Sequence, residues 1–178
     1  NSYDSSWSKV SLPWMAHGYE LKVTPLQTLS FYNAIANNGK FVKPLIVKKI
    51  IKANNVIKEF DTEIFEEKIA SNRSIQKAKV LLEGVVERGT AKNINNSYYK
   101  IAGKTGTAKK VINGRYVNKY YTSFVGFFPS EKPQYSCIVI IDEPKNYRIY
   151  GSDVAAPVFR EISDRLLLTD HNVFNEFQ

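Results

Sequence analysis

Cysteine is nearly absent from this sequence, and its scarcity excludes several kinds of site. The one cysteine, Cys137, cannot form a disulfide within the chain. With only two histidines as well, the sequence has too few imidazole and thiol groups for a zinc site or a serine–histidine pair. We therefore expect no metal site and no cofactor. Cys137 itself lies in an apolar run, which predicts a buried thiol.

Long hydrophobic runs and long runs of one charge are also absent. No stretch reaches the roughly 20 apolar residues that cross a bilayer, and the first residues do not have the pattern of a signal peptide. The net charge of +8 comes mostly from scattered lysines, with no basic run longer than two residues. This distribution favours a solvated surface over a nucleic-acid interface. We predict no nucleic-acid partner, and we expect the chain to begin in the middle of a longer protein.

The clearest structural signal is a helix start at Thr24. A threonine at the N-cap, a proline at the first helical position and a glutamine three residues after the cap all indicate it. We expect this helix to end at Asn37 and, because it is apolar nearly all round, to lie inside the domain. Two further helices are predicted, at residues 71–89 and after residues 151–153. In the last one, the residues expected to face the core are Ala155, Val158, Phe159, Ile162 and Leu166.

Alternating apolar residues and turn signals predict the strands. They are expected at residues 46–51, 56–60, 99–109, 121–128 and 134–142. Residues 53–55 predict a hairpin turn between the first two, and Asn113-Gly114 predicts another after the third. The run at 134–142 is apolar on both faces, which predicts a central strand. Grouped strands with flanking helices indicate an α+β domain with a mostly antiparallel sheet.

The stretch whose groups could bind a ligand or take part in a reaction is Lys104-Thr105-Gly106-Thr107. On an extended strand, Thr105 and Thr107 point to one face and Lys104 points to the other. Fixed hydroxyl donors, a backbone amide and a nearby positive charge together form a site for a carboxylate or an oxyanion. The glycines indicate a close backbone approach, by either a packed neighbour or a ligand.

Two families use a lysine–threonine pair after a glycine, and spacing separates them. A phosphate-binding loop requires another glycine five residues before Gly103, where this chain has Tyr98. That loop also continues into a helix, whereas Gly106 and Gly114 interrupt any helical pattern here. The nucleotide-binding interpretation is therefore disfavoured. The other family carries Lys-Thr-Gly as the third of three motifs, after S-x-x-K and S-x-N.

Segments on both sides of this stretch carry a family pattern. They are GYELKVTPLQ at 18–27, NNG at 37–39, VKP at 42–44, GVVERGTA at 84–91, AGKTGTA at 102–108, FVGFFP at 124–129, IIDEP at 140–144 and VAAPVF at 154–159. In this order they resemble the C-terminal half of the transpeptidase domain of class B penicillin-binding proteins, especially the cell-division type. One departure is Tyr150-Gly151-Ser152, where the family more often shows paired glycines.

The resemblance implies part of a β-lactamase-like transpeptidase fold. It also implies a D,D-transpeptidase that cross-links peptidoglycan stem peptides through an acyl-serine and is acylated by β-lactam antibiotics. Lys104, Thr105, Gly106 and Thr107 would bind the substrate, with the two threonine hydroxyls on its carboxylate. Lys104 and Thr107 would also serve catalysis, because Lys104 supplies positive potential and the Thr107 amide supplies one oxyanion donor.

The same resemblance implies a location and further partners. The domain would lie at the periplasmic or extracytoplasmic face of the cytoplasmic membrane, held by an anchor N-terminal to this chain. Other cell-division or cell-wall proteins would be its partners. The competing interpretation is a non-catalytic binding module of the cell envelope, which the intact Thr105 and Thr107 disfavour.

The nucleophilic serine is expected to lie outside this chain. S-x-x-K matches such as Ser6–Lys9 and Ser74–Lys77 are a chance-level signal, because fourteen serines and nineteen lysines give about 1.5 matches by chance, and S-x-N does not occur. Lys77 also lies away from the apolar stripe of its predicted helix, which indicates a solvent-facing amine. We therefore expect residues 1–178 to be the C-terminal portion of a single transpeptidase domain, inactive alone. The adjacent Asp142-Glu143 pair is expected to point apart on its strand.

Overall fold

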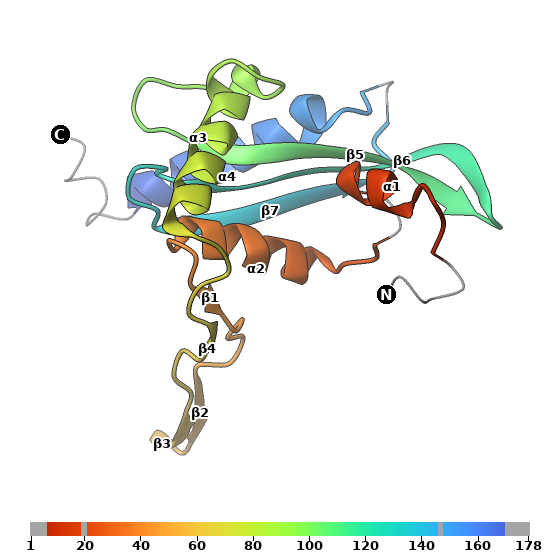
Figure 1. Ribbon diagram of the computed structural model, residues 1–178. Helices are drawn as coiled ribbons and strands as arrows, with labels where there is room; N and C mark the ends of the chain where they lie inside the picture. Colours follow the sequence, from red (N-terminus) through yellow and green to blue (C-terminus); the bar gives the residue numbers. More distant parts are fainter. Residues whose placement is uncertain (1–6, 19–20, 146–147, 170–178) are drawn as a thin grey trace.

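A three-stranded antiparallel sheet forms the centre of the fold in the computed structural model, which describes residues 7–18, 21–145 and 148–169 (Figure 1). Its strands are β5 (Ala102–Ile112), β6 (Arg115–Phe128) and β7 (Tyr135–Asp142), in the order β5-β6-β7. Asn113 and Gly114 both have positive φ, at 51° and 74°, as a two-residue hairpin turn requires. The predicted turn is confirmed, and β6 is longer than predicted because it continues directly from it.

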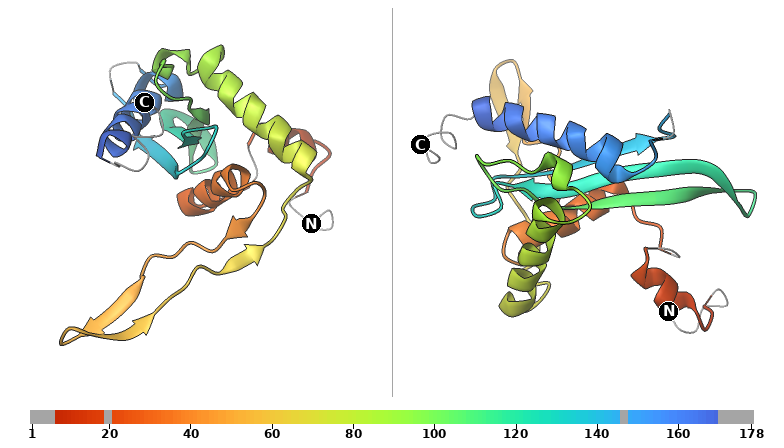
Figure 2. Two further views of the ribbon diagram at one scale, coloured as in Figure 1. Left: turned by 90° about the vertical axis from the view of Figure 1, so that its left-hand side faces the viewer. Right: turned by 90° about the horizontal axis from the view of Figure 1, so that it is seen from above.

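Helices cover both faces of this sheet. Helix α2 (Pro25–Ala36) and helix α4 (Gly151–Thr169) pack on opposite faces, and α3 (Asn72–Glu87) packs against β5 (Figures 1 and 2). Alternation along β6 explains the arrangement, because neighbouring residues of a strand face opposite sides. The predicted α+β architecture with an antiparallel sheet is confirmed.

Two apolar clusters form the core, one on each face of the sheet. Phe124 and Phe128 of β6 pack with Phe159 of α4 in the larger cluster. Phe127 packs on the other face with Ile35 of α2 and Ile75 of α3. The clusters are separated by the sheet itself, so β5 is held from both sides.

Helix α2 begins as predicted but is less buried than expected. The Thr24 side chain accepts the Gln27 amide proton, and the Gln27 side chain accepts the Thr24 amide proton, so the capping box is complete. Leu26 and Phe31 are about half exposed, at 45% and 52%. The expectation that α2 lies wholly inside the domain is wrong for the described residues, because only one side of the helix packs on the sheet.

Strand β7 lies at an edge of the described sheet and is not central as predicted. Its apolar residues have another cause: α2 packs on one of its faces and α4 on the other. An edge strand covered on both faces needs apolar side chains in both directions, just as a central strand does. Cys137 of β7 is half-buried against the α4 side, and burial raises the pKa of its thiol.

Helix α4 presents a buried stripe rotated from the predicted one. Val158 and Leu166 are exposed at 39% and 36%, and Ser163 is fully buried. Ser163 turns inward because its hydroxyl lies 2.6 Å from the Tyr99 hydroxyl. The buried residues of the helix are Gly151, Ala155, Ala156, Phe159, Ser163 and Leu167.

The remaining elements lie outside the central sheet. They are α1 (Ser11–Ala16), the short strands β1 (Phe41–Val42), β2 (Lys49–Lys52), β3 (Asn55–Glu59) and β4 (Ile64–Glu66), and the 3₁₀ helix η1 (Lys92–Ile94). Strands β2 and β3 form the predicted hairpin, at the end of an arm that projects from the body (Figure 2). Its turn is Ala53-Asn54, both at positive φ. Within the described residues, no helix has the length and apolar character to span a bilayer.

Replacing Phe159 with alanine is expected to destabilise the domain strongly. The ring is fully buried and contacts Phe124 and Phe128, with centroids 4.8 and 5.5 Å away. The free energy of unfolding should fall by about 3–5 kcal/mol, as for other buried aromatic truncations. Chemical denaturation of the full-length protein measures it, and Phe31→Ala, on the exposed side of α2, is the matched control. Equal losses in the two variants would contradict the assigned core.

Candidate active site

The four residues Lys104 to Thr107 lie on an open edge of the sheet. Strand β5 pairs with β6 on one side and has no partner strand on the other among the described residues. Lys104 and Thr107 are exposed, and Thr105 and Gly106 are half-buried. The segment is therefore an extended strand open to solvent along one edge, where unpaired backbone groups can meet a ligand.

Each of the two threonine hydroxyls has a partner from another element. The Thr107 Oγ1 accepts a hydrogen bond from the Gly151 amide at 3.2 Å, at the start of α4. The Thr105 Oγ1 lies 3.1 Å from the Thr90 Oγ1, in the connection between α3 and β5. Both hydroxyls are thus held in place from outside β5.

The Lys104 side chain folds along its own strand. Its Nζ donates to the Thr105 carbonyl oxygen at 2.8 Å and approaches the Thr105 Oγ1 at 3.4 Å. A primary ammonium group has three donors, so this arrangement leaves donor capacity for an anion. Within the described residues no group of three or more histidine, cysteine, aspartate or glutamate side chains is placed to bind a metal. Two hydroxyls and one ammonium group at a strand edge suit a carboxylate.

A packed neighbour accounts for the glycine in this segment. A Cβ on Gly106 would clash with the Ser123 Oγ of β6. Gly151, whose amide binds Thr107, is equally confined: a Cβ there would clash with the Ser123 carbonyl oxygen and lie 2.8 Å from the Gly106 carbonyl oxygen. The start of α4 therefore sits directly on β5, which is what lets the Gly151 amide reach Thr107.

Replacing Gly151 with alanine is expected to separate α4 from β5. The added Cβ has no space, so overpacking should lower the free energy of unfolding by about 1–3 kcal/mol. Ser152→Ala, one residue along, is the control and should change it by less than about 0.5 kcal/mol. Denaturant titration of both variants measures the difference. A Gly151→Ala protein as stable as the parent would show that the contact is not tight.

The carboxylates of Asp142 and Glu143 at the end of β7 converge, which corrects the expectation that they point apart. Glu143 has a positive φ of 51°, and this turn brings its side chain back beside that of Asp142. Lys110 Nζ lies 2.6 Å from Asp142 and 2.7 Å from Glu143, and Lys119 lies 3.0 Å from Glu143. Hydrogen bonds from Lys110 and Lys119 lower the pKa of Glu143. The cluster ties β7 to the β5–β6 hairpin.

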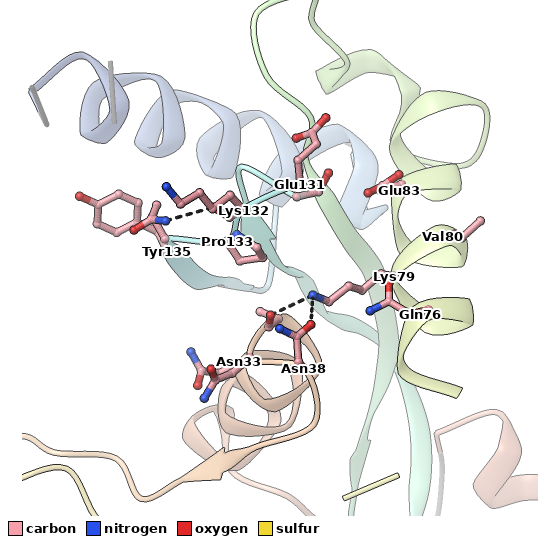
Figure 3. Close-up of a pocket in the computed structure, with 14 residues that line it drawn as sticks. Asn33, Asn38, Gln76, Lys79, Val80, Glu83, Glu131, Lys132, Pro133 and Tyr135 are labelled. Carbon is pink, nitrogen blue, oxygen red and sulfur yellow. Dashed lines mark hydrogen bonds between the residues drawn. The ribbon is translucent and has the colours of Figure 1, made fainter. Parts of the chain in front are cut away.

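A polar hollow of about 610 Å³ lies between α2, α3 and the β6–β7 connection, away from Lys104–Thr107 (Figure 3). Lys79 crosses it and donates to the Ala36 carbonyl oxygen at 3.0 Å and to Asn38 Oδ1 at 2.8 Å. Partial burial lowers the pKa of this lysine. An ammonium group on the last carbonyls of a helix complements the helix dipole, so Lys79 joins α3 to the end of α2.

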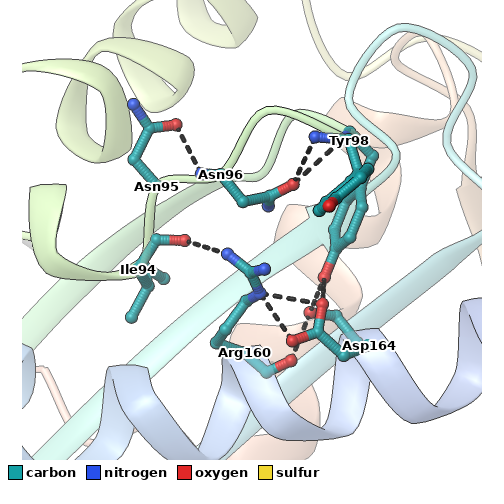
Figure 4. A network of polar contacts seen from close by, with 8 residues as sticks. Ile94, Asn95, Asn96, Tyr98, Arg160 and Asp164 are labelled. Carbon is teal, nitrogen blue, oxygen red and sulfur yellow. Dashed lines mark hydrogen bonds and ion pairs between the residues drawn. The ribbon is translucent and has the colours of Figure 1, made fainter.

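A partly buried polar network fixes the connection that precedes β5 (Figure 4). The Tyr99 hydroxyl donates to Asp164 at 2.7 Å, and Arg160 binds both carboxylate oxygens of Asp164 at 2.8 Å. Arg160 also donates to the Ile94 carbonyl oxygen at 3.0 Å. Burial raises the pKa of Tyr99, and the neighbouring Asp164 carboxylate raises it further. The tyrosine therefore stays a neutral donor, and α4 is locked to residues 94–99.

Comparison with known proteins gives this site its context. Residues 1–164 match the family described as the penicillin binding protein transpeptidase domain. The chain belongs to this family. The resemblance read from the sequence is confirmed, including its class B assignment.

Individual relatives agree with the family assignment. The chain is 36% identical over 169 residues to peptidoglycan D,D-transpeptidase FtsI of Buchnera aphidicola subsp. Baizongia pistaciae, covering 94% of this chain and 28% of the relative. It is 34% identical over 150 residues to stage V sporulation protein D of Bacillus subtilis, covering 83% and 23%. The apo transpeptidase domain of penicillin-binding protein 3 from Burkholderia pseudomallei superimposes with a TM-score of 0.75 at 29% identity, covering 93% and 48%. The chain thus spans about a quarter of the length of these curated relatives.

The S-x-x-K matches in the chain do not form a catalytic pair in the described residues. Ser6 lies outside them. A third match, Ser97–Lys100, has both side chains exposed, and Lys100 pairs with Glu87 and Glu131. Ser74 and Lys77 are both exposed on the first turns of α3, and the Ser74 hydroxyl lies 2.9 Å from the Ser71 hydroxyl, not from a lysine. A serine nucleophile needs an adjacent base within hydrogen-bond distance. Neither residue is close to the open edge of β5 in any contact that the structure records.

Thr90 and Gly151 are the residues of this site that sequence reasoning missed. Thr90 lies in GVVERGTA, a segment that carried the family resemblance, and Gly151 lies in the Tyr150-Gly151-Ser152 loop, where the chain departs from the family pattern. Sequence spacing does not reveal their role, because Thr90 is 15 residues and Gly151 is 44 residues from its partner threonine. Only the packing of the α3–β5 connection and of α4 on β5 brings them together.

Proposed function

We propose that the protein containing this chain is a D,D-transpeptidase that cross-links peptidoglycan stem peptides through an acyl-serine intermediate. The observation that supports it most directly is the Lys104–Thr107 segment on an open strand edge, in a chain that belongs to the penicillin-binding transpeptidase family. In this proposal the chain supplies the strand that binds the substrate. The serine and its lysine base come from the rest of the protein.

The proposed roles follow from the chemistry of each group. Thr105 and Thr107 donate hydroxyl hydrogen bonds to the terminal carboxylate of the stem peptide, or to the carboxylate of a β-lactam. Lys104 adds positive potential beside them, and the Thr107 amide stabilises the oxyanion that forms when the serine attacks the carbonyl carbon. Gly106 leaves room for the Ser123 side chain of β6 beside the strand.

The proposal extends to location and partners. An enzyme that acts on peptidoglycan works outside the cytoplasm, so we place this domain on the periplasmic or extracytoplasmic face of the cytoplasmic membrane, held by an anchor elsewhere in the protein. Other cell-division or cell-wall proteins are its proposed partners. Similar identities to FtsI and to stage V sporulation protein D support the cell-wall role without separating division from sporulation.

Turnover of a stem-peptide substrate tests the proposal. The full-length protein should release terminal D-alanine from a pentapeptide-bearing glycan and form a cross-linked dimer, and penicillin should block both reactions. Liquid chromatography with mass spectrometry detects the products. Penicillin binding without any turnover would contradict the enzymatic proposal and favour a non-catalytic binding module instead.

A further inference from the structure

The connection between α3 and β5 reaches the candidate site through one side chain. Thr90, two residues after Arg88 caps α3, places its Oγ1 3.1 Å from the Thr105 Oγ1. Thr90 is exposed, and the hydroxyl pair lies beside the Lys104 ammonium group. A third hydroxyl thus lies next to the two that the proposed function assigns to the substrate carboxylate.

The position of Thr90 is fixed by contacts of the residues that follow it. Asn93 Nδ2 donates to the Ser152 carbonyl oxygen at 2.8 Å, at the start of α4. Arg160 of α4 holds the Ile94 carbonyl oxygen at 3.0 Å (Figure 4). Ala91 is fully buried in the core cluster that contains Phe159. The connection therefore cannot shift without moving α4, and Thr90 has a defined distance to β5.

The direction of each hydroxyl proton is decided by its other partner. A threonine hydroxyl has one proton to donate and two lone pairs to accept with. At Thr107 the Gly151 amide is a donor only, so the Thr107 proton is left for an acceptor outside the protein. For the Thr105 proton to be left for such an acceptor too, its neighbours must donate to the Thr105 oxygen. These neighbours are the Lys104 ammonium group, which can only donate, and the Thr90 hydroxyl.

We propose that Thr90 is a positioning residue that donates its hydroxyl proton to Thr105 Oγ1 and thereby directs the Thr105 proton toward the carboxylate of the substrate or β-lactam. This inference rests on the proposed function. Thr90 acts on Thr105 as the Gly151 amide acts on Thr107. The two ligand-facing hydroxyls are thus oriented by two different elements, the α3–β5 connection and the start of α4.

The test compares acylation of the full-length protein by penicillin and by penicillin methyl ester, which lacks the anionic carboxylate. Thr90→Val removes the donor and keeps the β-branched shape, and because Thr90 is exposed it leaves no buried polar group unpaired. We expect the second-order acylation constant for penicillin to fall about two- to tenfold, the range for one neutral hydrogen bond. The constant for the methyl ester should change less than about twofold.

Three controls complete the design. Thr90→Ser keeps the hydroxyl and should restore the penicillin constant. Thr62→Val, an exposed threonine on the projecting arm, should leave both constants unchanged. In a double-mutant cycle, Thr90→Val should have little further effect once Thr105 is valine, because the two hydroxyls act as one unit.

Each other result overturns the inference. Equal losses for penicillin and its ester would mean that Thr90 supports the fold and does not orient Thr105. Three results would contradict the positioning role of Thr90 and leave the proposed function standing. They are unchanged acylation constants in Thr90→Val, additive effects in the double-mutant cycle, and a Thr90→Ser protein that does not recover the penicillin constant. A parent protein that neither compound acylates would overturn the proposed function, and this inference with it.

Discussion

The acyl group of penicillin attaches outside residues 1–178 when the full-length protein is acylated and mapped by mass spectrometry. We expect this result because a serine nucleophile needs a base within hydrogen-bond reach, and the two described S-x-x-K pairs, Ser74–Lys77 and Ser97–Lys100, place their side chains in solvent. The 178-residue chain, incubated alone, should gain no mass. The expected effect is all or none.

Two variants sharpen this first prediction. Ser74→Ala in the full-length protein should be acylated at the parent rate, because the Ser74 hydroxyl contacts Ser71 and not a lysine. Ser6→Ala should behave in the same way. An adduct on either serine, or a tenfold loss of acylation in either variant, would place the nucleophile inside this chain.

Replacing Thr107 with valine should reduce the acylation rate of the full-length protein roughly ten- to a hundredfold. In the proposed role of Thr107, the change removes a charge-assisted hydrogen bond to the ligand carboxylate, worth about 1.5–3 kcal/mol. It also leaves the Gly151 amide without the oxygen that it binds at 3.2 Å. Stopped-flow measurement of penicillin acylation gives the rate, and thermal unfolding shows how far the fold is affected.

The serine variant separates these two effects. Thr107→Ser keeps the oxygen for the Gly151 amide and the proton for the ligand, so it should retain most of the parent rate. Thr62→Val, an exposed threonine between β3 and β4, is the control for loss of a threonine hydroxyl. A Thr107→Val protein with the parent rate would mean that this hydroxyl does not face the ligand.

Local chemistry in the sequence predicted several elements correctly. The capping residues Thr24 and Gln27 placed the start of α2, and Asn113-Gly114 placed the β5–β6 turn, because both signals act over four residues or fewer. The helix predicted to begin at residue 71 also starts there, with Ser71 as its N-cap. Such signals are readable because the partners are close in the chain.

Packing overruled the sequence pattern where partners are distant. The sequence of β7 predicts a central strand because it is apolar on both faces. In the structure β7 is an edge strand, and its apolar faces are covered by two helices. The buried stripe of α4 is rotated because Ser163 turns inward to Tyr99, 64 residues earlier. Glu143 joins Asp142 on Lys110 because one residue takes a positive φ, which a strand pattern does not reveal.

Local sequence patterns were enough to predict the α+β class and the Lys104–Thr107 segment, since side-chain chemistry and strand alternation are properties of adjacent residues. The motifs also predicted the family, which the match over residues 1–164 confirms. The surroundings of that segment, in contrast, depend on how distant parts of the chain pack. Thr90 and Gly151 reach Thr105 and Thr107 across 15 and 44 residues, through the packing of the α3–β5 connection and of α4 on β5. Contacts at such separations depend on the whole core, so no local pattern encodes them.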